Sequence, residues 1–277
     1  MIKVGSYNKL KVEKQTSFGF YLTDGVANVL MPNKYAPEGL RIDDELEVFI
    51  YADSEDRPLA TTLTPKAVAG EIAALKVKIV NQVGAFLDWG LEKDLFVPFG
   101  EQLEKMIAGR TYCVRVMLDE LTNRVIATSK LKKHLQPVPR SFTAGREVEI
   151  IVVRVDDTGA DVVADKKYSG KLYSNEIFEE LHSGDCRKAY IKKVRADGRL
   201  DLSLQKQGYH AVVGDATETI LTTLKAHDGF IGVNDKTPPA EIEKLFHMSK
   251  KTFKKALGSL YKTRVVTVEE SGITLLK

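Results

Sequence analysis

The chain has 277 residues, of which 43% are hydrophobic and 29% are charged, and its formal net charge is +3. This composition is typical of a folded globular protein, and the small net charge excludes a polybasic protein while leaving room for local basic faces. No apolar run approaches the ~20 residues that span a bilayer, and the N-terminal stretch MIKVGSYNKL lacks a signal-peptide core. We therefore expect a cytoplasmic protein without a membrane partner.

The sequence carries few signs of catalytic chemistry. Its five histidines are scattered without metal-ligand spacing, and neither GxxxxGK[ST] nor GxSxG occurs. We therefore predict no enzyme, no metal site and no cofactor. Cys113 and Cys186 lie in apolar or alternating runs, so we expect two buried thiols in a reducing compartment.

Two sets of landmarks recur along the first 205 residues. Glycines stand in strand-like segments at Gly19 (SFGFYL), Gly84 (QVGAFLDWG) and Gly159 (DTGADVV). Arginines lead into a later strand at Arg57 (RPLATT), Arg124 (RVIATS) and Arg199 (RLDLSL). The glycines are 65 and 75 residues apart and the arginines 67 and 75. Two independent landmarks with nearly equal spacing indicate three copies of one structural unit.

Each copy has the pattern of five short strands. In the second copy we expect strands at 75–80, 85–90, 94–99, 112–118 and 124–129, with a polar helical or 3₁₀ turn at 99–106. Five strands in some 65 residues, with a helical turn between the third and the fourth, are typical of an OB-fold barrel. The predicted barrel domains are 1–66, 67–135 and 140–205, and Pro137 and Pro139 are expected to stiffen the linker between the last two.

The remaining domain, predicted at 210–277, changes character. A capping box at Asp215 and Glu218 predicts a first helix to about Ala226, and two prolines lead into a second helix. Ser249 is expected to cap a third helix, and a hairpin pattern follows at 265–276. This order predicts an α/β winged helix-turn-helix domain. The fold class is thus mainly β and multidomain: three tandem five-stranded OB-fold barrels followed by a winged helix.

The repeat resembles the S1-type RNA-binding domain in FGFY and VGAF, in GKLYSNEI on the third strand and in RLDLSL on the last. Three such copies before a winged helix resemble the layout of the conserved virulence factor B (CvfB) family of bacterial RNA-binding proteins. The resemblance implies that RNA lies across one barrel face. It is held there by a ring before the glycine, a ring two residues after it, an aromatic or His on the third strand, and an acidic residue and an arginine around the last turn.

The matching residues differ from copy to copy. Copy one keeps Phe18, Tyr21, Asp53 and Arg57, with Met31 at the third-strand position, and copy two keeps Phe86, Glu120 and Arg124, with Val83 and Val97 in place of rings. Copy three keeps Tyr173 and Arg199 but has Thr158 and Asp161 instead of the two rings, which favours a spacer or protein contact. We expect Gly19 to allow a local twist or a bulge that brings Phe18 and Tyr21 to one side.

Several further residues have alternative roles. We expect Phe20 in the barrel core, Trp89 in packing or at the rim rather than on a base, and Phe96 and Phe99 in the core or a lid. In the last domain, four lysines fall outside the apolar face of the third helix and are candidate phosphate contacts: Lys250, Lys251, Lys254 and Lys255.

The leading interpretation is a cytoplasmic protein that binds single-stranded RNA by base stacking and Arg/Lys contacts and regulates gene expression, including virulence, after transcription. Tethered barrels raise the effective concentration of weak sites. Two alternatives remain open. The winged helix would make the protein a DNA-binding transcriptional regulator, although its third helix lacks a clear set of Asn, Gln or Arg for base edges. The barrels would otherwise serve as a scaffold for ribosomal or RNA-processing proteins such as nucleases.

Overall fold

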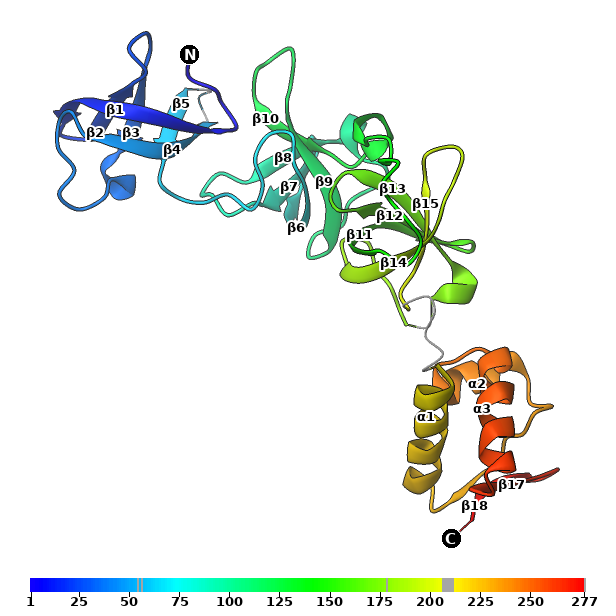
Figure 1. Cartoon of the computed structure of the whole chain (residues 1–277). Coiled ribbons are helices and arrows are strands. Elements are labelled where there is room, and N and C mark those ends of the chain that lie inside the picture. Colours follow the sequence, from blue (N-terminus) through cyan, green and yellow to red (C-terminus); the bar gives the residue numbers. More distant parts are fainter. Residues whose placement is uncertain (54, 56, 178, 206–211, 277) are drawn as a thin grey trace.

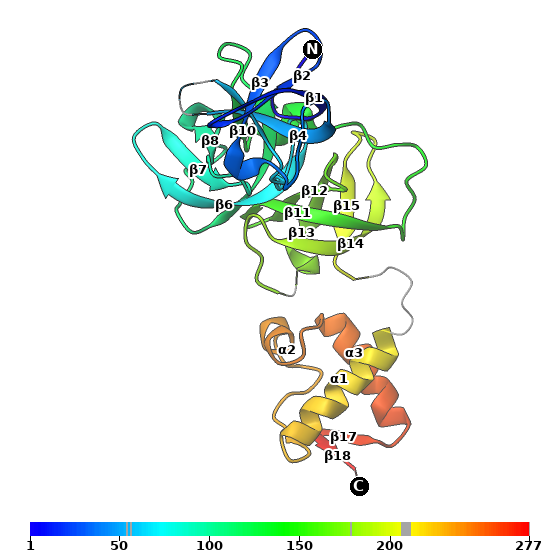
Figure 2. The same cartoon turned by 90° about the vertical axis from the view of Figure 1, so that its left-hand side faces the viewer.

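The computed structural model describes residues 1–53, 55, 57–177, 179–205 and 212–276. The described part includes three closed five-stranded barrels and a three-stranded sheet with three helices. Figure 1 shows the barrels one after another, and both Figure 1 and Figure 2 show the helices gathered in a separate body. The predicted domain limits stay predictions, and the predicted start of the last domain at residue 210 lies outside the described residues.

The three barrels share one topology. The first contains β1 (Tyr7–Thr16), β2 (Gly19–Thr23), β3 (Asn28–Pro32), β4 (Glu45–Ala52) and β5 (Pro58–Thr61). The second contains β6 (Ile72–Val80), β7 (Gly84–Asp88), β8 (Leu95–Pro98), β9 (Thr111–Leu118) and β10 (Val125–Thr128). The third contains β11 (Glu147–Asp156), β12 (Gly159–Ala164), β13 (Tyr168–Tyr173), β14 (Cys186–Val194) and β15 (Leu200–Ser203).

Within each barrel the strands follow the order first, second, third, fifth, fourth, and the third and fifth are parallel. A short 3₁₀ helix follows each third strand: η1 (Asn33–Tyr35), η2 (Phe99–Glu101) and η4 (Ser174–Glu176). A further 3₁₀ helix, η3 (Leu131–His134), follows the second barrel. The predicted OB-fold architecture is confirmed.

The repeated glycine has a steric role in all three barrels. A Cβ on Gly19 would lie 2.3 Å from the carbonyl oxygen of Met31, one on Gly84 2.3 Å from that of Val97, and one on Gly159 2.0 Å from that of Leu172. Only glycine therefore lets the second strand approach the third so closely. Of the two alternatives expected at Gly19, the bulge is wrong, because Gly19 pairs in regular register on both sides. The register shift lies in the first strand of each barrel instead, as between Val12 and Lys14, where extra curvature lets that strand pair on both sides.

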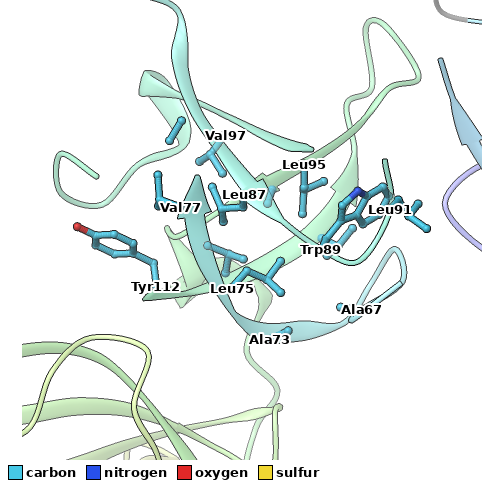
Figure 3. Packing of buried hydrophobic residues seen from close by; sticks show 14 of the residues in the cluster. Ala67, Ala73, Leu75, Val77, Leu87, Trp89, Leu91, Leu95, Val97 and Tyr112 are labelled. Carbon is cyan, nitrogen blue, oxygen red and sulfur yellow. The ribbon is translucent and has the colours of Figure 1, made fainter. Parts of the chain in front are cut away.

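The barrel cores follow strand alternation. Leu75, Val77, Leu87, Leu95 and Val97 fill the second barrel, with Trp89 and Leu91 at the opposite end of the cluster from Tyr112 (Figure 3). Phe20 is buried in the first barrel, as predicted.

Neighbouring barrels pack on each other through apolar contacts. Phe49 and Tyr51, on the outer side of β4, join the apolar cluster of the second barrel, and the Phe49 and Trp89 rings meet edge to face at 5.7 Å. The predicted packing role of Trp89 is confirmed. A second cluster joins the outer sides of the second and third barrels, formed by Ile72, Cys113, Leu131, Ile151 and Val163.

The two cysteines differ. Cys113 is buried, as predicted, but the expected burial of Cys186 is wrong. Cys186 is the first residue of β14 and lies on its outer side opposite Ile151, because Ala189 and Ile191 are the residues of β14 that alternate into the core.

The C-terminal domain contains α1 (Val212–Ala226), β16 (Phe230–Ile231), α2 (Pro239–Phe246), α3 (Lys250–Lys262), β17 (Val266–Glu269) and β18 (Gly272–Leu275). Its sheet order is β16-β18-β17, so the predicted hairpin forms the wing. Ser249 caps α3 by accepting from the Thr252 amide at 3.2 Å, as expected. Helix α1 begins at Val212, earlier than the capping box indicated, so Asp215 lies inside it. Among the described helices, none has the length and apolar character needed to cross a membrane.

Candidate nucleic-acid interface

Strand pairing defines an equivalent outer row on each barrel, because residues directly opposite one another lie on the same face of a sheet. The outer row of the first barrel consists of Lys14, Tyr21, Leu30 and Leu59. In the second barrel the outer row consists of Ile79, Phe86, Phe96 and Ile126. That of the third consists of Arg154, Asp161, Lys171 and Asp201. The same outer row is therefore mixed in the first barrel, apolar and aromatic in the second, and charged in the third.

The first barrel presents two adjacent rings. The Phe18 side chain is 56% exposed, and its ring centroid lies 6.3 Å from that of Tyr21 at an interplanar angle of 79°. The Lys14 ammonium lies 4.6 Å from the Tyr21 centroid. The two rings share one side, as predicted, because Phe18 lies in the turn before β2 and strand alternation does not apply to it. Rings next to a cation suit the stacking of a base beside a phosphate.

The acidic residue and the arginine of the first barrel bind each other. Arg57 donates through Nε at 2.9 Å to Oδ2 of Asp53, and its other nitrogens lie 2.8 Å from carboxylate oxygens of Asp53 and Glu55. Burial raises the pKa of Asp53, but hydrogen bonds from Arg57 outweigh it and hold that pKa below its usual value. Arg57 therefore stabilises the β4–β5 turn, and two carboxylates offset its charge.

The second barrel contains a ring pair that the sequence did not indicate. Phe86 lies on the outer row as predicted, and its centroid is 5.1 Å from that of Phe96, also half-buried. The expectation of Phe96 in the core or a lid is wrong, because Leu95 and Val97 point inward and alternation turns Phe96 outward. Phe99 also lies outside the core, and unlike Phe96 it is exposed. Strand alternation counted from the apolar Leu95 would have placed Phe96 on the outer face.

The expected third-strand position is shifted by one residue. Met31 and Val97 lie in the core, opposite Phe20 and Ala85, so they face away from the outer rows. Tyr173 is not their equivalent. It pairs with Gly159, and its hydroxyl donates to Asp201 at 3.3 Å.

The acidic position of the second barrel is also shifted. The Asp53 amide donates to the Arg57 carbonyl at 2.9 Å, and the Asp119 amide donates to the Arg124 carbonyl at 2.8 Å. Asp119, and not Glu120, therefore occupies the equivalent place, and Glu120 is exposed in the turn beside it. A hydrogen bond from the Thr122 hydroxyl is the main cause that lowers the pKa of Asp119.

The outer face of the third barrel carries an ion-pair network. Arg154 and Lys171 each lie within 3.3 Å of both Asp156 and Asp161. Hydrogen bonds from the hydroxyl and amide of Thr158 lower the pKa of Asp156 to about 2. Arg199, at the last turn, lies 3.9 Å from Asp197. Opposite charges at this face offset one another.

The four lysines lie along α3, outside its buried face. Lys250 donates to the carbonyl of Lys236 at 3.1 Å, and Lys254 lies 3.5 Å from a carboxylate oxygen of Asp235. Lys251 and Lys255 are exposed. The helix thus presents cations to solvent next to the loop that precedes α2. Among the described residues, no three His, Cys, Asp or Glu side chains gather as a metal site.

Comparisons with known proteins agree with this architecture. Residues 4–63 match the S1 domain family, and residues 218–275 match the CvfB-like winged helix domain. Both are nucleic-acid-binding domain types, so the chain is a multidomain protein of the nucleic-acid-binding class.

Two similar proteins identify the family to which this chain belongs. The chain is 31% identical over 293 residues to the uncharacterized protein YitL of Bacillus subtilis, covering 100% of this chain and 94% of that one. It is 28% identical over 249 residues to conserved virulence factor B of Staphylococcus aureus (strain N315), covering 85% and 82%. The chain belongs to the conserved virulence factor B family. A crystal structure of a multidomain protein with nucleic acid binding domains from Streptococcus pneumoniae aligns over 99% of this chain and 98% of that one, with 22% identity and a TM-score of 0.48.

Proposed function

We propose that this protein binds single-stranded RNA through its first two barrels and thereby regulates gene expression after transcription, as a non-catalytic protein of the cytoplasm. The observation that carries the proposal is the pair of ring sites, Phe18 with Tyr21 and Phe86 with Phe96, at equivalent faces of adjacent barrels. Stacking contributes about 1–3 kcal/mol per base with little sequence preference. Unpaired bases offer such stacking faces, whereas bases inside a duplex do not.

The third barrel has a different role in this proposal. Asp161 occupies the place of Tyr21 and Phe86, and its carboxylate is already paired with Arg154 and Lys171. We therefore assign this barrel to spacing or protein contact, and the α3 lysines to supplementary phosphate contacts.

Fluorescence anisotropy with a labelled single-stranded RNA tests the proposal. We expect salt-sensitive binding that weakens at least about tenfold in the Phe18→Ala/Tyr21→Ala/Phe86→Ala variant, the loss expected for one or more stacked bases. The control is Phe230→Ala, which removes another exposed ring, 46% accessible against 56% for Phe18, from the C-terminal domain. Absent RNA binding, or equal binding by the triple variant, would refute it.

A second candidate, duplex-DNA binding by the winged helix, is favoured by the exposed Lys251 and Lys255 on α3. Competition between duplex DNA and single-stranded RNA separates the two. We expect RNA to compete more strongly, and the double change Lys251→Ala/Lys255→Ala to affect DNA binding more than RNA binding.

A further inference from the structure

A pocket of about 430 Å³ lies where the first two barrels meet. Tyr51 and Ala52 at the end of β4 line it from the first barrel, and Phe86, Phe96 and Ile126 line it from the second. Trp89, the only tryptophan of the chain, also contributes to its wall. The volume lies within the range of small-ligand sites, and neither barrel encloses the pocket alone.

The outer rows of both barrels lead to this pocket. In the first barrel, Leu59 of the outer row pairs with Tyr51, which lines the pocket. In the second barrel, three of the four outer-row residues line it directly: Phe86, Phe96 and Ile126. A neighbouring cavity of about 370 Å³ shares Tyr51 and also includes Leu59. The outer rows of the two barrels therefore meet at the junction, where Leu59 and Tyr51 of the first barrel lie beside the second.

Cations lie beside the aromatic wall. Arg124 and Lys93 both line the pocket. The Lys93 ammonium donates to the carbonyl oxygens of Ala52 at 2.9 Å and of Asp53 at 2.5 Å. Asp94, an acidic residue of the lining, is paired with Lys78 at 2.8 Å. The aromatic wall matches the flat face of an unpaired base.

We propose that this junction pocket holds one nucleotide of the bound RNA, with its base against Phe86 and Phe96, so that one strand runs across both barrels. The inference rests on the proposed function, since it adds the position and the composite nature of one site to single-stranded RNA binding. In this arrangement Lys93 acts as a positioning residue, which holds the end of β4 against the second barrel.

The test uses the full chain and oligouridylate of about twelve nucleotides, which falls within the site sizes of OB folds. Because Trp89 lines the pocket, RNA should change its fluorescence with the same midpoint that anisotropy reports. Ala52→Phe fills the pocket from the first barrel without altering a predicted stacking ring. We expect it to abolish the fluorescence change and to weaken binding about tenfold, the effect of one lost stacked base. Ala108→Phe, on an exposed loop of the second barrel, should change neither signal.

The outcomes separate the two claims. If the unmodified chain fails to bind the RNA, the proposed function and the pocket are both refuted. If it binds while Trp89 stays silent and Ala52→Phe binds equally well, the pocket is refuted and RNA binding stands. Should Ala52→Phe lower the melting temperature, Phe96→Leu decides: it keeps an apolar wall but removes the ring, so a tenfold loss supports the nucleotide site and unchanged affinity overturns it.

Discussion

Replacing Gly84 with alanine should destabilise the second barrel through one steric contact. The added Cβ would lie 2.3 Å from the carbonyl oxygen of Val97 and 2.8 Å from the Phe96 ring, both below the 3.0 Å that real Cβ contacts respect. To relieve the clash, β7 and β8 must move apart by at least the difference between the 3.0 Å limit and the 2.3 Å contact. Overpacking of this kind costs about 1–3 kcal/mol. At a urea dependence of about 2 kcal/mol per molar, the unfolding midpoint should fall by roughly 1 M.

Trp89 makes the assay local, since this single tryptophan is buried in the second barrel and its fluorescence follows that barrel in the full chain. The matched control is Gly100→Ala in the same barrel, where a Cβ would project into open space. We expect that control to be neutral or slightly stabilising, because alanine restricts the unfolded chain. A Gly84→Ala transition that coincides with the unmodified one, or an equal loss in Gly100→Ala, would contradict the steric explanation of the repeated glycine.

Three further outcomes follow from the geometry. The pKa of Asp156 is lowered from 3.8 to about 2, so its contribution to the stability of the third barrel is present above about pH 4 and is lost as the pH falls toward 2. Asp156→Asn should flatten that part of the pH profile in thermal unfolding, whereas an unaltered profile would exclude this carboxyl as the cause. Lys93→Met removes two hydrogen bonds across the first junction, so hydrogen exchange of the Lys66 amide, which donates to the Trp89 carbonyl at 2.7 Å, should accelerate. In native protein, iodoacetamide should label exposed Cys186 and spare Cys113, whose pKa is raised by burial; equal labelling of both thiols would show that the second junction opens.

Much of the fold could be predicted because it depends on short-range patterns. The recurring glycine and arginine indicated three equivalent units, and the spacing of strands and turns indicated the OB fold. The Phe253, Ala256, Leu257 and Leu260 side chains of α3 are buried as the apolar periodicity implies. Strand β16 escaped prediction because two residues give no detectable alternation.

The candidate site could be predicted only in part, because its residues depend on register. A displacement of one residue moves a side chain to the other face of a sheet. Met31 and Val97 accordingly lie in the core rather than on the outer rows, Phe96 rather than Val97 faces outward, and Asp119 rather than Glu120 corresponds to Asp53. Phe18, Tyr21 and Phe86 lie where the glycine motif implied, because the motif itself counts from a residue whose position is fixed by steric contact.

The amino-acid sequence by itself determined the number of barrels, their topology and the location of the ring-bearing strands, since alternation, glycine and turn residues act within a few positions of the chain. Only the tertiary structure decided how the barrels meet. The junction pocket combines Tyr51 with Phe86 and Phe96, both of which follow it by more than thirty residues in the chain. Lys93 likewise donates to the carbonyl oxygens of Ala52 and Asp53. Such contacts depend on the packing of one closed barrel against another, which no local pattern encodes.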